Sequence, residues 1–191
     1  VMVIAARPSM GKTAFLLNIV ANTCFRKVEP VPTAFFNLEA SAEVMVQRML
    51  CMQTGINMSK MRQGMLRRYS DIPKIVSVAA SMAEAPLWID DKPGLTIDEF
   101  QDRARRLKKK HDIQFIAIDN LQRLRAPIFW GGGSREVEVG EISSGIKDLA
   151  RELDVPVIVL AQLRRKVESR GGGRPRVSDL RDSGAIEQDA D

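Results

Sequence analysis

Two kinds of hydrophobic pattern alternate along the chain. Short, almost unbroken apolar runs are typical of strands buried on both faces of a parallel sheet. Longer segments with apolar residues three and four positions apart are typical of helices. The predicted strands cover residues 1–5, 33–38, 86–90, 114–119 and 156–160. The alternation predicts an α/β fold, with a parallel sheet that binds ligands at the carboxyl ends of its strands.

The helices between these strands are predicted by their start signals and apolar faces. Ser41 precedes one helix, and Thr96 and Glu99 have the spacing of a capping box at the start of another. A later helix has apolar residues at helical spacing, namely Ile142, Ile146, Leu149 and Leu153. Residues 59–84 have weak periodicity, and we expect a helical insert there with breaks at Gly64 and Pro73.

The composition is that of a globular protein. With 191 residues, 45% of them hydrophobic and 28% charged, the chain can form one domain with a sizeable core. It has no apolar stretch of about 18 residues and no signal-peptide pattern, so we expect a cytoplasmic protein. Cys24, Cys51 and His111 are too isolated in sequence to indicate a disulfide or a metal site.

The positive charge is concentrated near the end of the sequence. Seven basic and two acidic residues lie between Arg164 and Arg181, so this segment accounts for the whole net charge of +5. A polyanion such as nucleic acid is the natural partner of such a segment. A second basic run, residues 103–110, could also touch nucleic acid, but we favour the interpretation that it is the solvated outer face of a helix.

The most informative stretch is residues 1–13, where a predicted strand leads through Gly11, Lys12 and Thr13 into a predicted helix. A helix N-terminus offers unpaired N–H groups and a partial positive charge, which suit a triphosphate. Lys12 can reach the terminal phosphates, and the Thr13 hydroxyl can hold Mg²⁺. The P-loop motif is incomplete, because Ala6 replaces its first glycine. A chance occurrence of GKT at a helix start is therefore the alternative.

Polar side chains lie at or just after the ends of four predicted strands: Glu39, Asp90, Asp119 and Gln162. Because the carboxyl ends of parallel strands meet at one edge of the sheet, these residues are expected near the phosphate loop. We interpret Asp90 as structural and the other three as candidate site residues. For Glu39, a simple acidic residue in the first turn of a helix is the alternative.

Five segments in this order resemble the C-terminal ATPase domain of DnaB-type replicative DNA helicases. They are ARPSMGKTAF, NLEAS, IDNLQ, AQLRR and SDLRDSGAIEQDAD. The family's phosphate loop commonly starts with alanine, which accounts for Ala6. The resemblance implies a RecA-like P-loop NTPase with a mostly parallel twisted sheet flanked by helices. It also implies that residues 1–191 are a single such domain, truncated at both ends, without the family's arginine finger and primase-binding domain.

The resemblance also implies roles for individual residues. Asp119 would hold Mg²⁺ together with Thr13, Glu39 would orient the attacking water, and Gln162 would sense the terminal phosphate. The nucleotide-binding residues would be Ser9, Met10, Gly11, Lys12, Thr13 and Ala14, with Lys12 also catalytic, and the DNA-binding residues would be Arg181, Asp182 and Gly184. Two of the family's positions differ here: Asn120 replaces a tyrosine and Asp182 a glutamate.

We therefore expect a motor that hydrolyses ATP with Mg²⁺, translocates 5′ to 3′ on single-stranded DNA and unwinds duplex. The resemblance implies a homohexameric ring, and a primase and a helicase loader as partners of the full-length protein. Two alternatives remain open at this point. One is a RecA- or RadA-like recombinase ATPase, and the other is a DNA-binding module that binds ATP without hydrolysing it.

Overall fold

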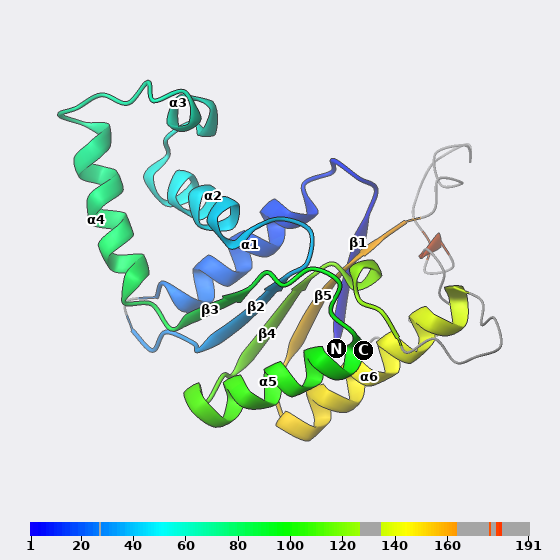
Figure 1. Cartoon of the computed structure of the whole chain (residues 1–191). Helices are drawn as coiled ribbons and strands as arrows, with labels where there is room; N and C mark the ends of the chain where they lie inside the picture. Colours follow the sequence, from blue (N-terminus) through cyan, green and yellow to red (C-terminus); the bar gives the residue numbers. More distant parts are fainter. Residues whose placement is uncertain (27, 127–134, 164–175, 177–178, 181–191) are drawn as a thin grey trace.

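The computed structural model describes residues 1–26, 28–126, 135–163, 176 and 179–180. A parallel sheet lies at the centre of the fold (Figure 1). Within these residues the sheet has five strands in the order β1-β5-β4-β2-β3. The strands are β1 (Met2–Ala6), β2 (Thr33–Asn37), β3 (Leu87–Asp90), β4 (Phe115–Asp119) and β5 (Val157–Gln162). Every neighbouring pair is parallel. The α/β prediction is confirmed, and all five predicted strands are present.

Helices cover both faces of the sheet (Figure 1). One face carries α1 (Lys12–Cys24) and α2 (Ala42–Thr54), and the opposite face carries α5 (Ile97–His111) and α6 (Arg135–Leu153). The central strand β4 is buried along its whole length. Its side chains alternate between the two cores: Ile116 and Ile118 pack toward α5 and α6, while Phe115 and Ala117 pack toward α1 and α2. This explains its unbroken apolar sequence.

The helical insert is divided differently from the prediction. It consists of α3 (Met58–Arg62) and α4 (Asp71–Ala83), which extend to one side of the sheet (Figure 1). Gly64, with a φ of 69°, does lie between the two helices. Pro73 does not break the chain, because it is the third residue of α4, where a proline removes no intrahelical hydrogen bond. The predicted break at Pro73 is therefore wrong.

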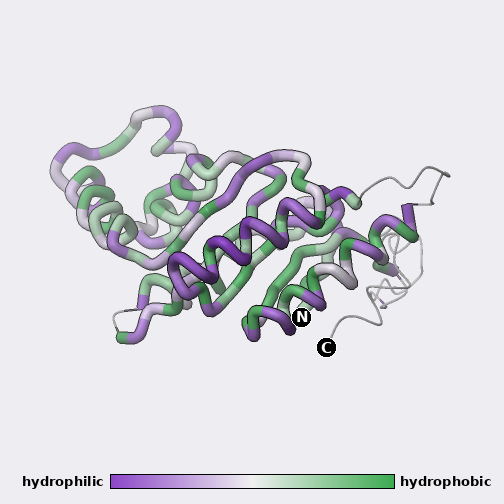
Figure 2. Tube along the Cα trace, turned by 60° about the horizontal axis from the view of Figure 1, so that its bottom comes forward, coloured by the Kyte–Doolittle hydropathy of each residue, from purple (hydrophilic) through white to green (hydrophobic). Residues whose placement is uncertain are grey.

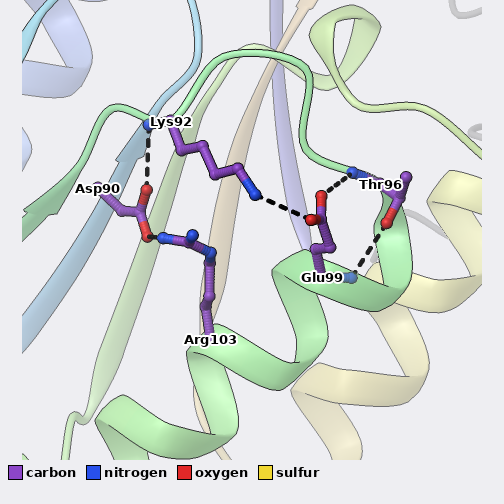
Figure 3. A network of polar contacts seen from close by, with 5 residues as sticks. All are labelled: Asp90, Lys92, Thr96, Glu99 and Arg103. Carbon is purple, nitrogen blue, oxygen red and sulfur yellow. Dashed lines mark hydrogen bonds and ion pairs between the residues drawn. The ribbon is translucent and has the colours of Figure 1, made fainter.

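The start of α5 is fixed by a polar network (Figure 3). The Thr96 hydroxyl accepts a hydrogen bond from the Glu99 backbone N–H, and the Glu99 carboxylate accepts one from the Thr96 N–H, both at 3.2 Å. Lys92 donates to Glu99 at 2.9 Å, and Arg103 donates to Asp90 at 2.6 Å. The predicted capping box is thus present, and Asp90 joins the end of β3 to α5.

Helices α5 and α6 pack closely through Gly145. A Cβ atom at this position would lie 2.6 Å from Cγ1 of Ile97, and the Gln101 amide donates to the Gly145 carbonyl at 2.9 Å.

The outer surface of α5 is hydrophilic along most of its length (Figure 2). There, the guanidinium of Arg105 forms two 2.8 Å hydrogen bonds with Glu152 of α6.

His111, Cys24 and Cys51 make packing contacts rather than forming a site. His111 ends α5 and stacks on Trp88 of β3, with ring centroids 4.2 Å apart. Cys24 is buried at the end of α1, which raises the pKa of its thiol to about 12, and Cys51 contacts the sulfur atoms of Met58 and Met61. Both cysteines are free thiols. Among the described helices, none has the length and apolar character needed to cross a membrane.

Candidate nucleotide-binding site

The loop between β1 and α1 has the backbone conformation of a tight turn around the helix start. Ser9 and Gly11 have positive φ values of 64° and 84°. Gly11 is the N-cap of α1, and no side chain caps this helix end. The first N–H groups of the helix therefore remain available to an external acceptor. A glycine suits position 11 because other residues are strained at such a φ.

A cavity of about 470 Å³ opens at this helix start. Its walls come from the loop, from α2 and from the carboxyl ends of three strands. The lining residues are Pro8, Ser9, Gly11, Lys12, Thr13, Ala14, Asn37, Glu39, Ala40, Met45, Arg48, Asp119 and Gln162. The volume is in the range of small-molecule sites. All of the predicted catalytic residues, Lys12, Glu39, Asp119 and Gln162, thus border one space.

Lys12 is held at the inner end of the loop. Its ammonium donates to the carbonyls of Ala6 and Arg7 at 3.0 and 3.3 Å. Burial lowers the pKa of Lys12, while the negative charges of Asp119 and Glu39 act in the opposite direction. Both carboxylates are therefore close enough to Lys12 to act on its charge, as expected for a shared phosphate site.

Thr13 and Asp119 form the most direct link across the cavity. The Thr13 hydroxyl donates to Oδ2 of Asp119 at 2.6 Å. Asp119 ends β4 and is only 2% exposed, and this burial raises the pKa of its carboxyl. The Thr13 hydrogen bond opposes the rise. A hydroxyl beside a buried carboxylate is a set of hard oxygen ligands that fits Mg²⁺. Among the described residues, no group of three or more acidic, histidine or cysteine side chains is arranged to hold a metal ion.

Glu39 lies two residues after β2, with its side chain 44% exposed at the rim of the cavity. The Asn120 amide donates to its Oε2 at 2.9 Å, and the Arg123 guanidinium lies 3.7 Å from its Oε1. The backbone N–H of Leu38 donates to the Asp119 carbonyl at 2.7 Å. The segments that carry Glu39 and Asp119 are thereby held side by side.

Gln162 is the last residue of β5 and lies beside Ala6 in the register of the sheet. The next residue, Leu163, is tied to the phosphate loop, because its N–H donates to the Ala6 carbonyl at 3.3 Å and its carbonyl accepts from Arg7 at 3.0 Å. Leu163 also forms a bridge with Leu180. The predicted DNA-binding residues Arg181, Asp182 and Gly184 lie outside the described residues.

Two observations add to the sequence predictions for this cavity. Met10 belongs to the loop, but it is 73% exposed and is absent from the cavity lining. Arg48 lines the cavity and its charge acts on Asp119, although no sequence motif singled it out. It is the only basic residue of α2, the helix that follows Glu39. That position was the signal that could have identified it.

Comparison with known proteins identifies a family that matches this chain. The family model described as DnaB-like helicase C terminal domain matches residues 1–191. The replicative DNA helicase DnaC of Bacillus subtilis (strain 168) is 45% identical over 194 residues, and so is the replicative DNA helicase DnaB of Geobacillus stearothermophilus. Each alignment covers 100% of this chain and 41% of the relative.

Solved structures agree with these sequence matches. A structure described as an ATPase domain superposes with a TM-score of 0.91 at 35% identity, covering 100% of this chain and 66% of the other. The structure of a DnaB-like replicative helicase and its interactions with primase gives a TM-score of 0.87 at 35% identity, covering 100% of this chain and 45% of the other.

Proposed function

Because the chain belongs to the family of DnaB-like helicase C-terminal domains, we propose that it is the ATP-hydrolysing motor of a replicative DNA helicase. The chain spans 41% of the length of its curated relatives. Translocation on single-stranded DNA and unwinding of duplex are therefore proposed for the intact protein. The observation that carries the proposal is the single cavity that joins the phosphate loop to Glu39, Asp119 and Gln162.

The phosphates of ATP would bind at the start of α1. The free N–H groups there donate to phosphate oxygens, and the positive end of the helix dipole favours their charge. Lys12 would exchange the carbonyls of Ala6 and Arg7 for the terminal phosphates, and Arg48 would supply a second positive charge from α2. Neutralising the phosphate charge is a large part of catalysis in phosphoryl transfer.

Thr13 and Asp119 would hold Mg²⁺, which supplies charge neutralisation at the phosphates when bound. Their hydrogen bond already sets the two oxygens at one point of the cavity. A cation there would also remove the cost of burying the Asp119 charge, which now raises the pKa of that carboxyl.

Glu39 would orient the water that attacks the terminal phosphate. Phosphoryl transfer depends mainly on positioning, so one carboxylate within hydrogen-bond reach of the water is sufficient. Gln162 would contact the terminal phosphate from β5. Because the basic segment beginning at Arg164 follows Gln162 so closely, loss of that phosphate would alter the segment's position and its hold on DNA.

The proposal extends to the assembly of the intact protein. We propose a homohexameric ring around single-stranded DNA, acting in the cytoplasm, with primase and a helicase loader as partners. A basic segment that contacts phosphates would give the sequence-independent binding that a translocating motor needs.

The test measures ATP hydrolysis and strand displacement by the intact protein. We expect Mg²⁺-dependent hydrolysis that single-stranded DNA stimulates, and unwinding of a forked duplex. Glu39→Gln should retain ATP binding and lose at least about 100-fold in kcat. Binding of ATP without turnover in the wild-type protein would favour a nucleotide-gated module, and strand pairing without unwinding would favour a recombinase.

A further inference from the structure

We propose that Asn120 is a positioning residue that sets the orientation of the Glu39 carboxylate during ATP hydrolysis. The inference rests on the proposed function, since it assigns a partner to the carboxylate that would orient the water. It is carried by the hydrogen bond from Nδ2 of Asn120 to Oε2 of Glu39, which is 2.9 Å long and joins residues 81 positions apart.

The two partners differ in how firmly they are held. Asn120 is only 1% exposed, whereas the Glu39 side chain is 44% exposed. A glutamate at the rim of a cavity has few packing contacts and several accessible rotamers. A buried donor on a fixed backbone selects among those rotamers. The hydrogen bond from the Leu38 N–H to the Asp119 carbonyl holds the segment that carries Glu39 beside the segment that carries Asn120.

The orientation of the Asn120 amide follows from its surroundings. If the amide were flipped, its oxygen would face the Glu39 carboxylate and two acceptors would meet. In the observed orientation Oδ1 is buried and has no hydrogen-bond partner among the described residues. Among the described residues, the amide of Asn120 therefore bonds to Glu39, with Asn120 as the donor and the Glu39 carboxylate as the acceptor.

The segment that follows Asn120 contacts both Glu39 and helix α6. Arg123, in the short 3-10 helix η1 (Leu121–Arg123), lies 3.7 Å from Oε1 of Glu39. The carbonyl of Gln122 accepts a 2.9 Å hydrogen bond from Arg135 of α6. The Ala126 N–H donates to Glu138 of the same helix at 3.4 Å. Contacts with α6 thus hold the segment that follows Asn120.

An amide is suited to this task because it is neutral. A lysine or arginine at the same distance would pair with the carboxylate and weaken its ability to accept a proton or a hydrogen bond from water. The amide occupies Oε2 alone and leaves Oε1 for the attacking water. The Arg123 guanidinium forms an ion pair with that oxygen at 3.7 Å, but both side chains are exposed, so solvent screens this pair.

The experiment compares Asn120→Asp and Asn120→Ala with the wild-type intact protein. Asn120→Asp has nearly the same shape but replaces the donor with a carboxylate that repels Glu39. We expect kcat for ATP hydrolysis to fall about tenfold in Asn120→Ala and further in Asn120→Asp. The KM for ATP should stay within about twofold in both, because neither variant changes a group proposed to touch the phosphates.

Two outcomes would overturn the inference. One is an unchanged kcat in both variants, and the other is a rise in KM that accompanies a loss of thermal stability, as expected for a merely structural residue. If Asn120→Asp does not fold, Asn120→Ala decides alone, because it removes the donor without adding a charge. A wild-type kcat in a folded Asn120→Ala would then refute the inference.

Glu39→Gln separates the positioning role from the proposed function. Wild-type kcat in that variant would refute the proposed role of Glu39 itself. An inactive Glu39→Gln beside fully active Asn120 variants would instead refute the positioning role alone.

Discussion

The Thr13 hydroxyl and the Asp119 carboxylate are 2.6 Å apart, although 106 residues separate them in the chain. Their contact joins the first turn of α1 to the end of the central strand. It brings together the two oxygen ligands proposed for Mg²⁺, one polar and partly accessible, the other charged and buried.

Removal of the Thr13 hydroxyl should weaken magnesium binding. We expect Thr13→Ala to raise the Mg²⁺ concentration needed for half-maximal ATP hydrolysis about tenfold or more, because the metal then has one ligand fewer. Thr13→Ser should resemble the wild type. Thr23→Ala is the matched control, because the Thr23 hydroxyl bonds only to carbonyls within α1. An identical magnesium requirement in Thr13→Ala and the control would remove Thr13 from the metal site.

Lys12→Ala should bind ATP about 100-fold more weakly, because the variant cannot make a charge-assisted hydrogen bond to phosphate. The fold should persist, since within the described part of the chain the ammonium donates to two loop carbonyls alone, and its burial disfavours the charge. Titration with a fluorescent ATP analogue and a thermal melt measure the two effects. Lys60→Ala, on the exposed α3, is the control. Unchanged affinity in Lys12→Ala would refute the role of Lys12.

Asp71 gives a prediction for the dependence of stability on pH. The backbone N–H, Nε and Nη2 of Arg67 donate to the Asp71 carboxylate at 2.9, 3.2 and 3.0 Å, which lowers the pKa of Asp71 from 3.8 to about 2. The charged form is favoured in the folded state, so the stabilisation is complete above pH 3.8 and is lost as the pH falls through 2. Urea unfolding of wild type and Asp71→Asn should therefore differ most at about pH 5 and less at about pH 3. A difference that does not change with pH would contradict the assignment.

Gly145→Ala should destabilise the domain by about 1–3 kcal/mol, because the added methyl group overlaps Ile97 at the contact between α5 and α6. Urea unfolding measures this loss. In an Ile97→Ala background the methyl group has room, so the same substitution should cost less there. Equal costs in the two backgrounds would show that the clash is relieved elsewhere.

Arg181→Ala should lower the salt dependence of single-stranded DNA binding by about one in the logarithmic slope, as expected when one phosphate is no longer neutralised. Arg106→Ala, on the exposed face of α5, should leave the slope unchanged. The reverse result would move the DNA site to the basic helix. Fluorescence anisotropy of a labelled oligonucleotide at several salt concentrations measures both slopes.

Most of the sheet could be predicted because its strands are short apolar runs with polar residues at their ends. The same rule selected Glu39, Asp119 and Gln162, because parallel strands bring their carboxyl ends to one edge. Pro73 was misread as a break because a proline in the first turn of a helix has the same sequence signature as one in its interior.

Other features depend on tertiary contacts that no local pattern encodes. The sequence marks Arg48 as the sole basic residue of α2, but that it lines the cavity depends on how α2 packs beside the phosphate loop. The bond between Asn120 and Glu39 depends on the pairing of β2 with β4, which places residues 81 positions apart in contact. The requirement for glycine at 145 likewise arises from the approach of a second helix.

The stacking of Trp88 on His111 provides the protein with a built-in optical probe. The chain has two tryptophans, and replacing Trp130 with phenylalanine leaves the indole on β3 as the sole one. Its emission would then change whenever the last turn of α5 moves away from the edge of the sheet. Movements of that helix during the proposed nucleotide turnover can thus be followed in real time without attaching a dye.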